Sequence, residues 1–304
     1  MGGSPDRTPV MIRFLAFSAL TSTLATGEIT IIDDTKLLAG LRDRLGEFAD
    51  SGEFPTVAEV AKALAESPKH VPDSLELKLT GQSSDDPSAS VFLLGSVYKC
   101  DKCDDWHSGG VATAWALTRD GYLVTNHHVL DQERGAVVGV VDRSGKSYPI
   151  VSVVAADEDA DVAIFKVDAD DLTPLALGPE PRVGAEIRVI SHPQRRFFTE
   201  TYGRVSRYFR RPARRDRGES TWMTITADYA KGSSGGPVLD DKNRVVGMVS
   251  FTQSIYYNSQ DNKPTNLQMV IKNTVPVRAM RDLLEAEAPV TAVEGVEKEA
   301  AQVR

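Results

Sequence analysis

The stretch Gly232-Ser233-Ser234-Gly235-Gly236-Pro237 lies between two runs of the sequence that are typical of β-strands. Glycines stand on both sides of the serine pair, at positions where the backbone has to turn tightly. A nucleophilic serine needs such a turn, because its hydroxyl must project into a cleft while backbone N–H groups converge where an oxyanion will form. Loops of glycine and serine are also common without this chemistry, so the interpretation depends on the rest of the chain.

Two stretches upstream of Ser234 supply the residue types that would activate it. Asp161 begins an apolar run, and an aspartate at the start of a strand would lie at the rim of a barrel, where it could orient an imidazole. The alternative is an ordinary turn aspartate, since several others lie nearby. Further upstream, the segment TNHHVL holds two of the five histidines, His127 and His128. The chain order histidine, aspartate, serine belongs to two-barrel proteases.

Together these motifs resemble those of the trypsin-like (chymotrypsin-fold) serine peptidases, and in particular the bacterial HtrA/Deg-type protease domain, over residues 91–273. The family patterns T-N-x-H-V, D-[ILV]-A-[ILV] and G-x-S-G-G-P match segments 125–129, 161–164 and 232–237. Two weaker matches are Val183-Gly184 leading to Ser191-His192-Pro193, and Gly203-Arg204-Val205-Ser206. The resemblance implies a serine endopeptidase whose partners are protein or peptide substrates.

The resemblance also implies a role for each residue of the site. Ser234 attacks the peptide carbonyl to form an acyl-enzyme, His128 accepts its proton, and Asp161 orients the imidazole. The backbone N–H groups of Gly232 and Ser234 correspond to the oxyanion hole, and the reaction requires no metal or organic cofactor. The register of T-N-x-H-V selects His128 and leaves His127 at the variable position, since neighbouring side chains diverge in a strand and in a helical turn alike.

The cleavage site is predicted from two further positions. Asp228 lies six residues before Ser234, the offset at which trypsin has the aspartate that selects Lys or Arg. The alternative is a strand-end aspartate that forms only local hydrogen bonds. Ser250 and Thr252 match the substrate-binding strand of the family, and Thr252 stands where an open-pocket enzyme usually has glycine. A threonine there implies a narrower pocket and favours small or medium aliphatic side chains.

From Val91 onward, short β-rich runs alternate with turn residues. They form two sets, which predict a mainly β fold of two tandem antiparallel β-barrels over residues 91–180 and 181–274. Residues 33–50 and 56–66 carry apolar side chains at helical spacing, which predicts a small N-terminal helical hairpin and linker over residues 28–90. This hairpin is interpreted as either an inhibitory pro-segment or a partner-binding unit. Residues 275–304 are predicted to form a C-terminal helix and, from Pro289, a disordered tail.

The composition is that of a globular protein with a sizeable core: 304 residues, 41% of them hydrophobic and 26% charged. The net charge is −8, which argues against nucleic acid as a partner. Positive charge is concentrated only between Arg204 and Arg217, a segment that is either an anion-binding loop or, as we favour, a solvated one. The sequence carries no signal for the oligomeric state.

The N-terminus suggests export. Residues 1–27 contain a short apolar run that begins at Met11 with one positive charge, and Ala25 and Gly27 are small at the positions that a signal peptidase reads. The alternative is an ordinary helix or leader. No other stretch is long and apolar enough to span a membrane. Fewer than about 35 residues follow Ile271, too few for the PDZ domain that HtrA-type proteins usually carry.

Cys100 and Cys103 are the only cysteines and form a CxxC, with His107 shortly after them. In an exported protein a disulfide is favoured. A metal or redox module is the alternative, although structural zinc normally takes four ligands and three are evident here. A second alternative for the whole chain is a catalytically silent binding protein on the same fold. The complete set of serine, histidine and aspartate argues against it.

Overall fold

The computed structural model describes residues 29–212, 219–260 and 263–285. The leader that begins at Met11, residues 213–217 of the basic segment and the tail from Pro289 lie outside the described residues. Every helix and strand in the described ranges belongs to the unit Ile32–Arg304. No helix among the described residues has the length and apolar character needed to cross a membrane.

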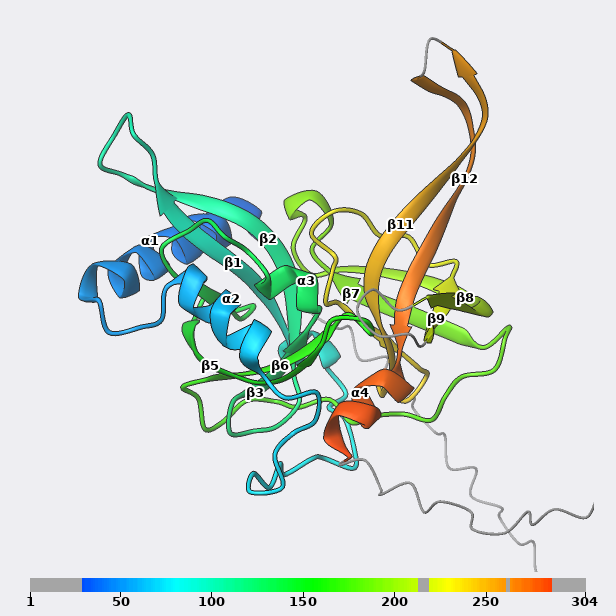
Figure 1. Ribbon diagram of the computed structural model, residues 1–304, viewed down its shortest axis with the longest axis horizontal. Helices are drawn as coiled ribbons and strands as arrows, with labels where there is room; N and C mark the ends of the chain where they lie inside the picture. The colour runs from blue at the N-terminus through cyan, green and yellow to red at the C-terminus, as the bar shows by residue number, and fades with distance from the viewer. Residues whose placement is uncertain (1–28, 213–218, 261–262, 286–304) are drawn as a thin grey trace, which may run out of the picture. The chain divides into compact units, whose positions relative to one another are not determined.

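The first barrel is a closed antiparallel sheet in the order β1-β2-β3-β6-β5-β4 (Figure 1). Its strands are β1 (Val91–Lys99), β2 (Trp106–Ala116), β3 (Tyr122–Thr125), β4 (Val138–Val141), β5 (Ser147–Asp157) and β6 (Val162–Val167). The first half of β1 is apolar without alternation because both of its faces are covered. Phe92 and Leu94 belong to the barrel core, whereas Leu93 packs in a separate cluster with the N-terminal helix.

The second barrel is also closed, in the order β10-β11-β12-β9-β8-β7. Its strands are β7 (Glu186–Ser191), β8 (Thr199–Pro212), β9 (Glu219–Ile225), β10 (Pro237–Leu239), β11 (Val245–Gln260) and β12 (Lys263–Pro276). Val189, Met223 and Val238 lie in its core. Strands β11 and β12 continue beyond the barrel as a long hairpin (Figure 1). The prediction of two tandem antiparallel barrels is confirmed.

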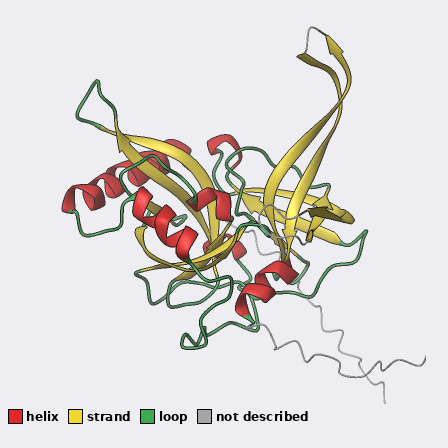
Figure 2. Cartoon of the chain, in the orientation of Figure 1, coloured by secondary structure: helices red, strands yellow, loops and turns green. Residues whose placement is uncertain are grey.

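Two helices cover the first barrel, so the predicted N-terminal helical extension is confirmed. Helix α1 (Asp34–Ser51) begins at Asp33, whose carboxylate accepts the Lys36 N–H, and α2 (Val57–Glu66) begins with a capping box between Thr56 and Glu59. The apolar side of α1 packs on β1 and β4, and the apolar side of α2 joins the core of the barrel itself. Both helices therefore pack against the first barrel and cover its apolar side chains (Figure 2).

A shared core joins the two barrels. Trp115 of β2, Met248 of β11 and Met280 of the C-terminal helix α4 (Val277–Leu284) belong to one buried cluster. Three short elements complete the fold: α3 (His127–Leu130) and two 3₁₀ turns, η1 (Pro87–Ser90) and η2 (Pro193–Arg195). Because the barrels meet over this core, α3 and the start of β6 face the turn that precedes β10. The C-terminal helix was also predicted, and is confirmed.

Candidate active site

His128 lies in α3, the single helical turn that follows β3 in the first barrel. The turn is held from both sides. The Thr125 hydroxyl donates to the Thr113 carbonyl at 2.8 Å, and the Asn126 side-chain amide donates to the Asp161 carbonyl at 2.9 Å. His127 is buried, whereas the side chain of His128 is 48% exposed. The turn therefore presents His128 to the space between the barrels.

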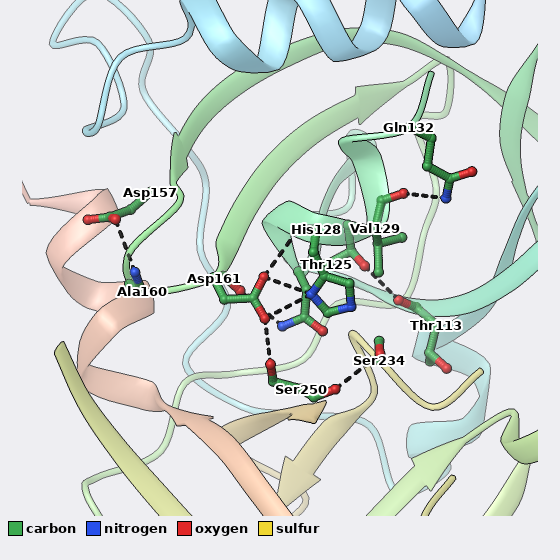
Figure 3. Close-up of polar contacts among 11 residues, drawn as sticks. Thr113, Thr125, His128, Val129, Gln132, Asp157, Ala160, Asp161, Ser234 and Ser250 are labelled. Atoms are coloured by element: carbon green, nitrogen blue, oxygen red, sulfur yellow. Dashed lines mark hydrogen bonds and ion pairs between the residues drawn. The ribbon is translucent and has the colours of Figure 1, made fainter. Parts of the chain in front are cut away.

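Asp161 stands immediately before β6, with a left-handed backbone (φ 57°). Its carboxylate accepts three groups: His128 Nδ1 at 2.9 Å, the His128 backbone N–H at 3.1 Å and the Ser250 hydroxyl at 2.5 Å (Figure 3). A carboxylate only accepts, so Nδ1 of His128 carries the proton. Nε2, on the opposite side of the ring, is then the nitrogen that can take up a proton.

Ser234 lies in the turn before β10, between two glycines with left-handed backbones. Gly232 has φ 98° and Gly235 has φ 85°. A Cβ on Gly235 would lie 1.9 Å from the Thr113 carbonyl oxygen, and one on Gly232 would lie 2.5 Å from the His192 carbonyl oxygen. Both positions therefore require glycine, for conformation and for space.

Contacts across the barrel interface hold the Ser234 turn. The Thr113 N–H of β2 donates to the Ser234 carbonyl at 2.8 Å, and the Thr113 hydroxyl donates to the Gly232 carbonyl at 3.1 Å. The Ser234 hydroxyl donates to the Ser250 carbonyl at 3.1 Å (Figure 3). Ser234 and His128 therefore come from facing barrels and share Ser250 as a neighbour, and no hydrogen bond joins them among the described residues.

Two backbone N–H groups around Ser234 have no hydrogen-bond partner among the described residues. The Lys231 carbonyl accepts the Gln194 N–H at 2.7 Å, and the Ser233 carbonyl accepts the Gly236 N–H at 2.9 Å. In a trans peptide bond the C=O of one residue and the N–H of the next point in opposite directions. The Gly232 N–H therefore points away from the contact made by the Lys231 carbonyl, and the Ser234 N–H points away from the contact made by the Ser233 carbonyl. Within the described part of the chain neither N–H is hydrogen-bonded, and both remain available to an anionic oxygen.

Gln194 and Arg195, in η2, are left-handed residues that the sequence analysis did not single out. The Gln194 N–H donates to the Lys231 carbonyl and so fixes the orientation of the peptide group that carries the Gly232 N–H. The support is given by a backbone group that any residue except proline can supply. The nearby motif Ser191-His192-Pro193 was the only signal that this turn is part of the site.

Asp228 does not occupy the base of a pocket. Its side chain is 88% exposed, and its carboxylate lies 3.5 Å from the Lys272 ammonium. The same ammonium donates to the Tyr229 carbonyl at 2.7 Å. An exposed carboxylate with its own cation gives a substrate lysine or arginine little reason to bind there. The structure thus supports the alternative interpretation of Asp228 and corrects its predicted pocket role.

Ser250 and Thr252 lie on β11, where the resemblance placed the substrate-binding strand. Thr252 is exposed and pairs with Lys272 across the β11–β12 ladder. The Ser250 side chain is buried and is engaged with Asp161, while its carbonyl accepts from Ser234. The Ser250 side chain therefore orients the Asp161 carboxylate. The sequence predicted only a contact with substrate and did not predict this role.

A cavity of about 360 Å³ opens beside His128 and Asp161. Trp222 and Phe251 line it, and their rings meet edge to face at 5.1 Å between centroids. The Arg211 guanidinium lies 4.8 Å from the Phe251 ring centroid and 5.5 Å from that of Trp222. The lining of the cavity thus combines two aromatic rings and the Arg211 guanidinium with several carboxylates (Asp131, Glu158, Asp159 and Asp161).

The described part of the basic segment is strand rather than loop, because residues 204–212 belong to β8. Arg204 pairs with Glu186 and Arg210 with Glu219, all on exposed side chains. Arg211 and Arg207 lie over aromatic rings. These arginines are therefore engaged with their own barrel, in keeping with the favoured interpretation of a solvated segment.

His192 is fully buried behind the Ser234 turn. Its Nδ1 accepts the Phe198 N–H at 3.0 Å, and its ring packs edge-on against Phe197 and Phe198. Burial lowers the pKa of His192 from its ordinary value of 6.5 to about 4. Between pH 6.5 and about 4 the imidazole is therefore neutral in the folded chain and protonated in the unfolded chain.

This difference predicts a loss of stability in acid. Between pH 6.5 and about 4 the unfolded state binds a proton that the folded state excludes, so the free energy of unfolding falls as the pH drops, by about 3 kcal/mol in all. His192→Asn retains an acceptor near the Phe198 N–H but does not titrate, and should lose less stability over the same range. Urea denaturation at several pH values measures both slopes, and equal slopes would contradict the prediction.

Several known proteins are similar to this chain in sequence or in structure. Residues 112–248 match the family described as the trypsin-like peptidase domain. A probable periplasmic serine endoprotease, DegP-like, of Hahella chejuensis is 31% identical over 183 residues, which is 59% of this chain and 37% of that protein. A serine protease of Mycobacterium tuberculosis is 27% identical over 217 residues, 68% of this chain and 50% of that protein. An HtrA-type protease solved with a decapeptide has 19% identity and a TM-score of 0.49, over 63% of this chain and 61% of that one.

The two closed barrels, with the histidine and aspartate on one and the serine on the other, define a chymotrypsin-like architecture. Residues 112–248 match the trypsin-like peptidase domain, and a DegP-like serine endoprotease is among the relatives of the chain. The predicted resemblance is confirmed. The chain spans half or less of the length of the two curated relatives named above.

Proposed function

We propose that this protein is a serine endopeptidase that cleaves proteins or peptides through an acyl-enzyme formed on Ser234. The observation that carries the proposal is the hydrogen bond from His128 Nδ1 to the Asp161 carboxylate, opposite a serine in a glycine-flanked turn. The trypsin-like match over residues 112–248 includes all three residues. None of these steps requires a metal or an organic cofactor.

The reaction begins when the Ser234 hydroxyl turns from the Ser250 carbonyl toward Nε2 of His128. Nε2 takes the proton as the oxygen attacks the substrate carbonyl carbon, and Asp161 stabilises the imidazolium. The negative oxygen of the tetrahedral intermediate accepts from the N–H groups of Gly232 and Ser234, the two that have no partner in the described residues. His128 then protonates the leaving amine, and water hydrolyses the acyl-enzyme by the same steps.

A fluorophosphonate probe tests the nucleophile. We expect covalent labelling of the purified protein, complete loss of labelling in Ser234→Ala and retained labelling in Ser233→Ala. Ser233 is the matched control because it is the adjacent serine, and its buried hydroxyl accepts from the Ser191 hydroxyl at 3.0 Å. A wild-type protein that is folded but unlabelled would favour the silent binding protein instead.

The same preparation can be given a peptide library. We expect cleavage after Val, Ala or Leu, because the resemblance implies a narrower pocket with Thr252 and because Asp228 is exposed and lies beside Lys272. A preference for Lys or Arg that disappears in Asp228→Ala would restore the pocket role of that carboxylate.

We also propose that the protein acts after export, in the periplasm or outside the cell. The leader that begins at Met11 and the periplasmic name of the Hahella relative support this location. Recovery of the tagged full chain only from the cytoplasmic fraction would contradict it.

A further inference from the structure

Three metal-binding side chains meet at the turn between β1 and β2, outside the proposed active site. The Cys100 and Cys103 sulfurs are 3.3 Å apart and are not bonded to each other, and Cys103 Sγ lies 3.0 Å from His107 Nε2. All three donor atoms lie within 4.8 Å of one another. The cluster is local, because the hairpin brings His107 opposite Tyr98.

The third donor distinguishes this cluster from a pair of cysteines. A disulfide would use the two sulfurs and leave the imidazole without a role. Here the imidazole nitrogen lies nearer to Cys103 Sγ than Cys100 Sγ does, and its ring is set against the Tyr98 ring at 5.4 Å between centroids. An oriented imidazole beside two sulfurs is the donor combination that zinc prefers.

We propose that Cys100, Cys103 and His107 bind one Zn²⁺ ion, whose fourth position is open to water or to a donor from outside the chain. Tetrahedral zinc at its usual bond lengths separates neighbouring ligands by about 3.4–3.8 Å. The Cys100–Cys103 and Cys103–His107 donor pairs therefore need to move apart by about half an ångström. This movement is accessible because the turn lies at the surface, with Cys103 exposed. Among the described residues no carboxylate or further imidazole joins the three donors.

The site is independent of the proposed peptidase activity, so its test uses metal binding alone. The full chain is reduced, freed of metal and titrated with Co²⁺ and then with Zn²⁺. We expect one ion per chain, with the absorption of a tetrahedral cobalt–thiolate centre that Zn²⁺ removes. His107→Gln should weaken Zn²⁺ binding by more than the roughly 10- to 100-fold that loss of an outer-shell partner costs. Cys100→Ser should weaken it further, and His70→Gln, at a surface histidine elsewhere, should have no effect.

Two results would overturn the proposal. One is a reduced, folded protein that takes up no Zn²⁺ and whose two thiols simply re-form a disulfide in air. The other is Zn²⁺ binding that Cys100→Ser abolishes but His107→Gln leaves unchanged, since the site would then not include the imidazole. Far-UV circular dichroism of each variant shows whether the fold is retained, which separates loss of a ligand from loss of structure.

Discussion

Replacement of His128 by alanine is expected to lower kcat for peptide hydrolysis by about 10⁶-fold, the loss typical of removing the base from a serine triad. Because Nδ1 of His128 is held by Asp161 at 2.9 Å, its Nε2 is the nitrogen left to accept the Ser234 proton. The measurement is steady-state hydrolysis by the purified variant at saturating substrate. The thermal midpoint should stay close to that of the wild type, because the His128 side chain is half exposed.

His127→Ala is the control from the same helical turn. Its side chain diverges from that of His128 by about 100°, so it cannot face Asp161 and Ser234 in the same way. We expect kcat within about tenfold of the wild type, equivalent to a change of less than about 1.4 kcal/mol in the barrier. A large loss in His127→Ala with activity retained in His128→Ala would assign the base to the neighbouring residue.

Asp161→Asn is expected to lower kcat by about 10⁴-fold. The wild-type carboxylate accepts from His128 Nδ1, the His128 backbone and the Ser250 hydroxyl. An amide cannot accept from all three, because its nitrogen is a donor, and the imidazole is then held in the tautomer that cannot take the serine proton. KM should change little, since the substitution leaves the binding cleft in place. Hydrolysis rates of the purified variant check both values.

Two further variants control for charge and for position. Asp168→Asn removes an exposed carboxylate after β6 and should leave kcat unchanged. Ser250→Ala removes one donor to Asp161 and should lower kcat by only about 10- to 100-fold, the effect of one hydrogen bond to a charged group. A loss of less than tenfold in Asp161→Asn would show that the aspartate does not orient the base.

The Ser234 turn could be recognised from sequence because its constraints act on residue type. Gly232 and Gly235 have left-handed backbone conformations, and both lie very close to neighbouring backbone atoms. Residues with a Cβ are disfavoured at these positions for both reasons. The three motifs are short, local and rich in such constraints. The same reasoning covers the strands and helices, whose spacing of apolar residues reflects the faces that become buried.

Other parts of the site left little trace in the sequence. Thr113 and Gln194 hold the Ser234 turn through hydrogen bonds in which at least one partner is a backbone group. Most residue types can supply a backbone N–H, so no pattern of side chains identifies these positions. The orienting role of the Ser250 side chain was likewise hidden, because it depends on Asp161 from the other barrel.

Asp228 shows why an offset along the chain is not a position in space. Its distance from Ser234 in the sequence matches a specificity aspartate, but its side chain is exposed and paired with Lys272 of β12. Helices α1 and α2 show the same limit, since their patterns predict helices but not the barrel that their apolar sides cover.

The sequence by itself determined the residue types of the proposed chemistry, the glycine turn that presents the serine, and the two sets of strands. These features are local, and each one restricts which amino acids can stand at a given position. Only the tertiary structure decided that His128 and Asp161 face Ser234 across the barrel interface, and that Asp228 lies outside the cleft. Such facts depend on distances between segments that the fold brings together, and the linear order of residues does not contain those distances.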